Sequence, residues 1–284
     1  SANIDQAMVI FAVKSPEPNY NLLDRFILMM DYQDVPTVVV FNKTDLVSEG
    51  DIEELKKIYE KCGCKVIFIS TYDNKGITDY VLSEYGKTSE LIAYGGDHVL
   101  QDISADESDA ALQKYGLTAN RYSLAICRIE PENNVHTILE AFSQTPDQQI
   151  VFIGNWNKSV YGNDMQEKYS KFDNIKILPA IYDLRILNVL RSNCKYYLHG
   201  HSAGGTNPSL VEAMFFAKPI IAFDCIYNRE STENKACYFN SSKILIDILN
   251  DSSLDFENNA KSMEAIANRR YRWDIIAKQY ESLY

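Results

Sequence analysis

The sequence lacks several features that would assign it to a particular class of protein. None of its apolar runs approaches the roughly 20 residues that a membrane-spanning helix needs, so we expect no transmembrane segment. No basic, hydrophobic export signal opens it, which predicts a cytoplasmic protein and leaves peripheral attachment to a membrane open. Positive charge is scarce: the formal net charge of −11 at pH 7 argues against a nucleic-acid partner.

Cysteines are few and scattered. Of the six, only Cys62 and Cys64 lie close together, and no second pair or histidine follows at the spacing of a zinc site. Several others adjoin apolar segments, where a free thiol packs as a small apolar side chain. We therefore expect reduced cysteines, no bound metal and no cofactor. The chain does have length and apolar content: 284 residues, 46% of them hydrophobic, are enough for two packed domains.

Short β-rich runs alternate with amphipathic helical runs along most of the chain. Strands are predicted over residues 7–13, 37–42, 65–70, 90–94, 122–128, 149–155, 175–179, 195–200 and 219–224. Helices are predicted over residues 21–32, 51–62, 77–86, 136–144, 184–194 and 209–217, with three more in the tail at 241–251, 257–271 and 273–284. This alternation predicts an α/β fold of parallel sheets wrapped by helices.

The same pattern suggests a division into domains. The acidic segment from Leu100 to Gly116 interrupts the alternation and is predicted to be a linker or hinge. We therefore place a smaller N-terminal α/β domain at residues 1–99 and a second domain at residues 100–284.

One loop has the composition of an anion site. In "YYLHGHSAGGTNPSLVEAMFFAKPIIAFD", Tyr196 to Asp224, an apolar run ends in a polar, glycine-bearing loop that a helical run follows. Gly205, Thr206 and Asn207 precede the helix that Pro208 opens, and proline suits a first helical turn because it has no N–H to leave unpaired. Backbone amides converge in such a loop, so a phosphate is the ligand that this pattern predicts.

Three stretches extend this interpretation over the second part of the chain: "ICRIEPENNVHTILEAF", "VFIGNWNKSVYG" and "LHGHSAGGTNPSLVEAMFFAKPIIAFD". On these residues, the segment from about 76 to 284 resembles the C-terminal half of GT-B glycosyltransferases of family 4, and most of all the rhamnosyltransferase-like subgroup. The resemblance implies a Rossmann-like domain that binds a dTDP-, UDP- or GDP-linked sugar. It also implies transfer of that sugar, rhamnose in the subgroup, to a polysaccharide or lipid-linked acceptor without a bound metal.

The resemblance also implies roles for individual residues. Arg128 matches the family arginine that holds the diphosphate, for which a guanidinium fork is well suited. Glu212 matches the glutamate that accepts the ribose hydroxyls, and a carboxylate can accept two hydroxyl protons at once. The site would be completed by residues of the loop and the helix start: Gly205, Thr206, Asn207 and Ser209.

The chain departs from the family pattern at two positions. Asn133 stands where relatives have a lysine, and Gly204 stands where they have another glutamate. Simpler interpretations also remain open: Gly204 and Gly205 could only permit a tight turn, and Glu212 could be a solvated helical carboxylate. Arg128 could pair with a neighbouring glutamate, either Glu130 or Glu132. The strand-end histidines, His199 and His201, could be structural or catalytic, and no catalytic residue is assigned.

The first part of the chain carries a different pattern. The elements "NIDQ", "LLDRF" and "NKTDL" within residues 2–72 are similar to those of the circularly permuted RsgA-type GTPases that assist ribosome assembly. The resemblance implies a guanine site in which Asp45 and Asn42 bind the base edge and the Lys43 stem covers its face. Such polar contacts reject a base that lacks the matching groups.

The sequence contains no GxxxxGK[ST] phosphate-binding loop. We therefore interpret the guanine site as vestigial and expect no GTP hydrolysis. The two resemblances meet near residues 71–77, which predicts a chimera in which the GTPase-like fragment replaces most of the acceptor-binding domain of a glycosyltransferase. Two alternatives stay open: an engineered or recombined α/β protein without catalytic activity, and a GTP-binding protein that uses the NKTD segment.

Overall fold

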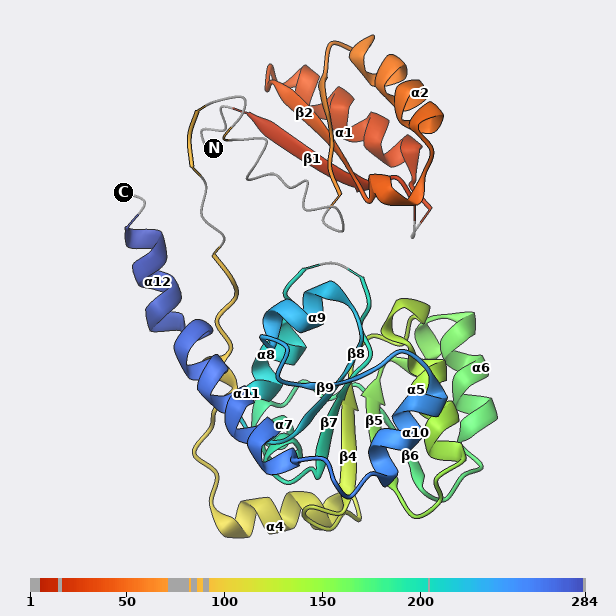
Figure 1. Ribbon diagram of the computed structural model, residues 1–284, viewed down its shortest axis with the longest axis vertical. Helices are drawn as coiled ribbons and strands as arrows, with labels where there is room; N and C mark the ends of the chain where they lie inside the picture. The colour runs from red at the N-terminus through yellow and green to blue at the C-terminus, as the bar shows by residue number, and fades with distance from the viewer. Residues whose placement is uncertain are drawn as a thin grey trace. The chain divides into compact units, whose positions relative to one another are not determined.

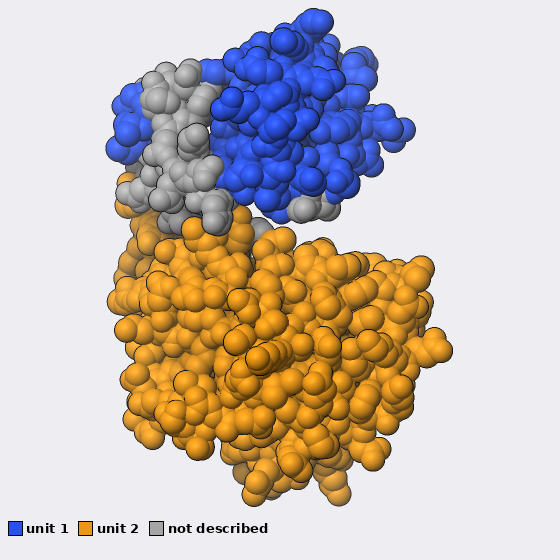
Figure 2. Space-filling view, turned by 45° about the vertical axis from the view of Figure 1, so that its right-hand side comes forward, with its two compact units in different colours: residues 1–91 blue, residues 92–284 orange. Residues whose placement is uncertain are grey.

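The chain folds as two compact units. The computed structural model describes residues 6–14, 17–70, 82, 86–88, 92–203 and 205–282. Unit 1 comprises residues 1–91 and unit 2 residues 92–284 (Figure 2). Each unit has its own parallel sheet with α-helices packed on it (Figure 1), so the predicted α/β, Rossmann-like fold class is confirmed.

Unit 1 contains a sheet of three parallel strands in the order β1-β2-β3. Its elements along the chain are β1 (Ala7–Ala12), α1 (Tyr20–Tyr32), β2 (Thr37–Asn42), a 3-10 turn (Thr44–Leu46), α2 (Glu49–Glu60) and β3 (Lys65–Phe68). The central strand β2 contains the apolar run Val38–Phe41, which is buried on both faces of the sheet, as the strands of parallel sheets usually are.

Both helices of unit 1 begin at side-chain caps. Asn19 accepts a hydrogen bond from the amide of Leu22 at the start of α1, and Ser48 with Asp51 forms a capping box at the start of α2. The inward side chains of the two helices, among them Leu23 and Tyr59, pack against one face of the sheet. Burial of this apolar layer holds the two helices on the sheet.

Unit 2 contains a sheet of six parallel strands in the order β6-β5-β4-β7-β8-β9. The strands are β4 (Tyr122–Ile126), β5 (Gln149–Gly154), β6 (Ile175–Pro179), β7 (Tyr196–His199), β8 (Ile220–Phe223) and β9 (Cys237–Phe239). Because all of them are parallel, their carboxyl ends lie along one edge of the sheet.

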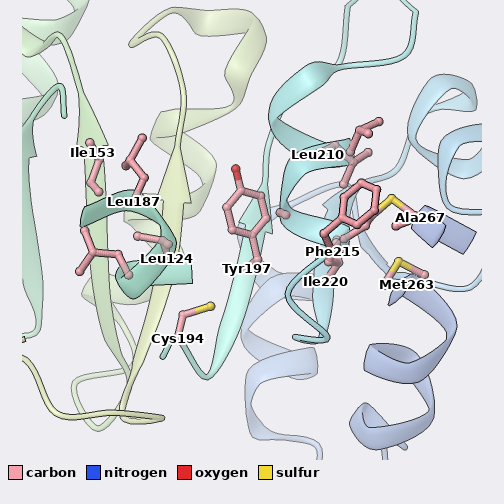
Figure 3. Packing of buried hydrophobic residues seen from close by; sticks show 14 of the residues in the cluster. Leu124, Ile153, Leu187, Cys194, Tyr197, Leu210, Phe215, Ile220, Met263 and Ala267 are labelled. Carbon is pink, nitrogen blue, oxygen red and sulfur yellow. The ribbon is translucent and has the colours of Figure 1, made fainter. Parts of the chain in front are cut away.

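Helices cover both faces of this sheet. One apolar cluster contains buried side chains of α4 (Ala105–Lys114), α7 (Leu184–Ser192), α8 (Pro208–Met214) and α11 (Phe256–Arg270). The other contains side chains of α5 (Val135–Ser143), α6 (Val160–Tyr169) and α10 (Ser242–Asn250). Figure 3 shows part of the first cluster, in which Tyr197 of β7 lies between Leu124 of β4 and Leu210 of α8. The remaining helices are α9 (Ile226–Ser231) and α12 (Trp273–Glu281).

The structure differs from the sequence prediction in several segments. The predicted linker contains α4, which begins at the Ser104 cap and buries Leu112, so the linker prediction was wrong. Residues 92–94 of the predicted strand at 90–94 form no strand, and the rest of that strand lies outside the described residues. The predicted helix at 77–86 lies almost wholly outside them. The pattern missed α6, α9 and the short strand β9.

Short 3-10 turns connect several elements of unit 2. The segment before α4 contains a 3-10 turn (Asp97–Val99), and two more such turns follow β4 (Pro131–Asn133) and β5 (Trp156–Lys158). Among the residues that the structure describes, no helix is both long enough and apolar enough to cross a membrane.

Candidate functional site

The strand order of unit 2 reverses at β4, which makes a topological switch point at the carboxyl ends of β4 and β7. From β4 the chain moves outward through β5 to β6, then returns to place β7 on the other side of β4. The loops that follow β4 and β7 therefore lead in opposite directions from neighbouring strands. In open α/β sheets, ligands bind outside the carboxyl ends of the strands at such a switch point.

Hydrogen bonds tie these two loops together. Asn133 is 3% exposed, and its side-chain Nδ2 donates to the carbonyl of Arg128 at 2.8 Å. Its Oδ1 lies 2.8 Å from Nδ1 of His201, in the loop after β7. The backbone amide and the hydroxyl of Ser202 both donate to the carbonyl of Glu132, each at 2.9 Å. The two loops thus form one continuous surface.

Gly200 allows the close approach of the loops. A Cβ on this residue would overlap the carbonyl oxygen of Asn133, a backbone atom that has no flexible side chain to move aside. The carbonyl of Gly200 in turn accepts a hydrogen bond from Nδ2 of Asn134 at 2.8 Å. Only glycine can occupy this position without forcing the loops apart.

Arg128 lies two residues after the end of β4 and is exposed. Within the described parts of the chain, no carboxylate lies within ion-pair distance of its guanidinium, and in particular neither Glu130 nor Glu132 does. The bond that its carbonyl accepts from Asn133 fixes the backbone at this point. The guanidinium therefore stands at the switch point with its donors available to a ligand.

The loop residues predicted to bind phosphate lie just before α8. Asn207 caps the helix: its Oδ1 accepts hydrogen bonds from the amide of Ser209 at 3.0 Å and from the Ser209 hydroxyl at 2.8 Å. The amides of Gly205, Thr206 and Asn207 donate to no other described backbone atom. Since α8 spans only 7 residues, its dipole is short, and these amides are the main donors that the loop offers an anion.

Glu212 lies one turn into α8, and its side chain is 19% exposed. Its Oε2 accepts a hydrogen bond from Nη2 of Arg191 on α7 at 2.5 Å. Its Oε1 lies 3.7 Å from Nε2 of His98, in the 3-10 turn before α4. The carboxylate therefore has a protein partner at each oxygen and keeps one accessible side.

The two strand-end histidines have different surroundings. His199 is 3% exposed, and its Nε2 has no hydrogen-bond partner among the described residues. Burial, together with the nearby His201 ring, lowers the pKa of His199 from 6.5 to about 3. His199 is therefore neutral near pH 7. His201 is less buried and takes part in the bridge to Asn133.

A hollow lies on the β5 and β6 side of the sheet. Its cavity volume is about 490 Å³, and it opens at the carboxyl ends of β5 and β6. Polar residues such as Asn155, Lys158 and Gln166 line it together with apolar ones such as Trp156 and Ile177.

In unit 1, the predicted guanine-binding residues lie in the turn after β2. Oδ1 of Asn42 accepts a hydrogen bond from the amide of Lys43 at 2.7 Å, and Lys43 has a left-handed backbone conformation with φ of 65°. Asp45 is exposed, and its Oδ1 accepts a hydrogen bond from the Ser70 hydroxyl at 2.6 Å. The hydroxyl of Thr44 donates to the carbonyl of Ile69 at 3.1 Å. The turn is thereby fixed to the end of β3.

Sequence reasoning missed Arg191 and His98, which contact Glu212, and it misjudged Asn133. Arg191 lies four residues after Leu187 and therefore falls on the inward helix face, which is otherwise largely apolar. A charged residue on such a face was a sequence signal for a buried ion pair. No sequence signal indicated His98, because it belongs to a separate segment of unit 2. Asn133 counted in the sequence only as a missing lysine, whereas in the structure it joins the two loops.

Comparison with known families finds the two families that the sequence patterns indicated, but it places the boundary between residues 95 and 108 and not near residues 71–77. The family model for glycosyl transferases of group 1 matches residues 108–273. The model for the RsgA GTPase family matches residues 1–95. The predicted pairing of a GTPase-like and a glycosyltransferase-like segment in one chain is thereby confirmed.

Two curated relatives are GTPases of the RsgA type. The small ribosomal subunit biogenesis GTPase RsgA of Agathobacter rectalis is 46% identical over 112 residues, which are 39% of this chain and 37% of that protein. The protein of the same name from Alkaliphilus metalliredigens is 41% identical over 95 residues, or 34% of this chain and 32% of that protein. The chain therefore spans about a third of the length of these relatives.

Solved structures share the fold over nearly the whole chain. HepE from Anabaena, solved with UDP and glucose, has a TM-score of 0.63 and 16% identity and covers 93% of this chain and 76% of its own. A glycosyltransferase from Rickettsia africae has a TM-score of 0.62 and 10% identity, with coverage of 100% and 98%. Sucrose-phosphate synthase from Thermosynechococcus elongatus has a TM-score of 0.60 and 15% identity, with coverage of 95% and 79%. At these identities the likeness concerns the fold alone.

Proposed function

Because the chain belongs to the glycosyl transferases of group 1, we propose that unit 2 binds a nucleotide diphosphate sugar at the carboxyl ends of β4 and β7. The diphosphate lies between the Arg128 guanidinium and the amides of Gly205, Thr206 and Asn207, with Ser209 nearby. Glu212 accepts the hydroxyls of the ribose. UDP, dTDP and GDP are all candidates for the nucleotide, and the UDP bound to HepE makes UDP the first one to test.

The hydrogen-bonded bridge between the two loops carries this proposal. Asn133 is bonded both to the carbonyl of Arg128 and to His201, so the arginine and the amide-bearing loop belong to one surface. A diphosphate needs a cation and amide donors within reach of the same group of oxygens. The exposed guanidinium without a carboxylate partner among the described residues supplies the cation.

The reaction of such a site is sugar transfer. The bond between the anomeric carbon and the diphosphate oxygen breaks, a hydroxyl oxygen of the acceptor bonds to that carbon, and the hydroxyl proton leaves to a base. The departing diphosphate takes the electron pair of the broken bond, and Arg128 with the loop amides stabilises the charge that develops on it. We assign no base, because His199 is buried.

We further propose that the sugar is rhamnose and that the acceptor is a polysaccharide or a lipid-linked saccharide. The resemblance of the "GGTNPSL" loop to the rhamnosyltransferase-like subgroup supports both statements. We expect slow turnover or none, because residues 1–95 match the RsgA family where relatives of this kind have an acceptor-binding domain. The alternative of a recombined protein without catalytic activity predicts a different result, a folded chain whose unfolding temperature no nucleotide shifts.

Calorimetric titration with UDP, dTDP and GDP tests the proposal. We expect Arg128→Gln to weaken binding of the preferred nucleotide by about tenfold or more, the effect of losing a hydrogen bond to a charged group. Arg121→Gln is the matched control, because Arg121 is exposed and stands directly before β4, at the opposite end of the same strand. Binding of none of the three nucleotides, or an equal loss in both variants, would contradict the proposal.

Unit 1 supports a second candidate function, the binding of a guanine nucleotide. The Ser70 hydroxyl fixes Asp45 Oδ1 while the carboxylate stays exposed, so its second oxygen can accept from the N1–H and amino group of guanine. We propose that this site binds the base without GTP hydrolysis, since the sequence holds no phosphate-binding loop of the GxxxxGK[ST] type.

A further inference from the structure

Arg191 is a charged side chain within the apolar layer of unit 2. It lies near the end of α7, is 3% exposed, and has the buried residues Leu187 and Leu190 on the same helix. Its guanidinium stands 5.9 Å from the centre of the Phe216 ring. Burying a guanidinium removes its hydration, so the protein must supply partners for its N–H groups.

The protein supplies those partners only in part. Nη2 donates to Oε2 of Glu212 at 2.5 Å, while Nε and Nη1 have no hydrogen-bond partner among the described residues. Apolar side chains of similar volume often replace a buried ion pair without loss of stability. Stability of the fold therefore gives no sufficient reason for an arginine at this position, and its one bond points to Glu212.

The other oxygen of Glu212 is held from a different direction. Oε1 lies 3.7 Å from Nε2 of His98, while the indole N–H of Trp273 donates to Nδ1 of His98 at 3.2 Å. Because Nδ1 accepts that bond, Nε2 carries the hydrogen and directs it toward the carboxylate. Each carboxylate oxygen of Glu212 thus has a neighbouring N–H group, and Arg191 makes the shorter and more buried of the two contacts.

We propose that Arg191 is a positioning residue that fixes the Glu212 carboxylate in the orientation in which it accepts the ribose hydroxyls of the nucleotide. This inference rests on the proposed nucleotide site. Oε2 uses one of its two lone pairs on Arg191, so the carboxylate keeps acceptor capacity for hydroxyl protons. Without Arg191, the glutamate side chain would be more mobile, and ordering it against the ribose would cost conformational entropy.

Nucleotides without ribose hydroxyls isolate this effect. The measurement is the dissociation constant of UDP and of GDP, each compared with its 2′,3′-dideoxy form, by calorimetry on the full chain. For the wild type, we expect the dideoxy form of the preferred nucleotide to bind about tenfold or more weakly, because two hydroxyls lose a charged acceptor. In Arg191→Met we expect that ratio to fall toward one, through weaker binding of the hydroxyl-bearing form.

Two further variants separate positioning from a general structural role. Arg191→Lys keeps a cation near Glu212 and is expected to restore part of the ratio. Arg185→Met removes an exposed arginine of the same helix, whose partner is Glu107, and is expected to leave the ratio unchanged. Both tryptophans of the chain, Trp156 and Trp273, belong to unit 2, so tryptophan fluorescence shows whether each variant keeps unit 2 folded.

The outcomes distinguish this inference from the function on which it rests. If the wild type binds neither UDP nor GDP, the uridine and guanosine forms of the nucleotide site are rejected, and the role of Arg191 with them. If the wild type binds a nucleotide but does not distinguish its dideoxy form, the inference alone is overturned. The same holds if folded Arg191→Met keeps the wild-type ratio while Glu212→Gln abolishes it. A ratio that falls in Arg191→Met and Glu212→Gln but not in Arg185→Met supports it.

Discussion

Replacing His199 is expected to remove part of the acid sensitivity of unit 2. His199 ends β7, is 3% exposed, and has its pKa lowered from 6.5 to about 3 by burial and by His201. In the folded state its ring therefore stays neutral over most of the acid range, whereas in the unfolded chain it takes up a proton below about pH 6.5. Protons thus bind preferentially to the unfolded state between these two values, and acid favours unfolding.

The size of the effect follows from the two pKa values. Above pH 6.5 the neutral ring makes its full contribution to stability, and that contribution is lost progressively as the pH falls toward the folded value of about 3. Because pH 5 lies about 1.5 units below the unfolded pKa of 6.5, the loss at this pH is about 2 kcal/mol in the free energy of unfolding. Other groups, such as Asp224, whose pKa is lowered by the hydrogen bond from Arg229, add their own acid sensitivity.

Comparison of variants separates these contributions. Urea unfolding of wild type and His199→Gln is followed at pH 7 and pH 5 by tryptophan fluorescence, which reports on unit 2. The wild type should lose about 2 kcal/mol more than the variant between the two pH values. His136→Gln serves as a control that removes an exposed histidine of α5. The reasoning is refuted if wild type and His199→Gln lose equal stability, since the buried ring would then contribute nothing to the linkage.

Two other predictions concern the loop junction and unit 1. Gly200→Ala should destabilise unit 2 by about 1–3 kcal/mol in urea unfolding, because its Cβ overlaps the Asn133 carbonyl. Gly205→Ala, whose Cβ meets no atom within 4 Å, should change stability little, and equal effects of the two would rule out the steric argument. Asp45→Asn should abolish any binding of GDP that resides in unit 1 and leave UDP binding intact. Equal calorimetric binding of the two nucleotides by the wild type would exclude guanine selectivity.

The sequence predicted the long apolar strands well and the short elements poorly. The predicted strands at 37–42 and 175–179 coincide with Thr37–Asn42 and Ile175–Pro179, because each is rich in apolar residues and is bounded by polar or turn-forming ones. The strand Cys237–Phe239 has only 3 residues, too few to establish a periodicity. Helix α4 buries a single side chain, Leu112, so its apolar stripe is too weak to distinguish it from an acidic linker.

The sequence also predicted only some of the residues that form the candidate site. A strand end followed by an arginine, and a glycine-bearing loop before a helix, are local patterns, so the sequence could indicate both Arg128 and the loop at 205–207. The contact between Arg191 and Glu212 depends on which face of α7 packs against α8, and local periodicity does not specify that choice. The sequence therefore indicated the groups that face a ligand but not the groups that hold them in place.

Asn133 shows how a departure from a family pattern can be misread as a loss. In the sequence it looked like a missing positive charge near the diphosphate. In the structure the residue is 3% exposed, and its amide donates to Arg128 on one side and accepts from His201 on the other. A lysine with this backbone geometry would bury an ammonium that can donate but cannot accept, and it would lose the bond from His201. The asparagine therefore keeps the two loops joined, and the exposed Arg128 is left as the cation for the ligand.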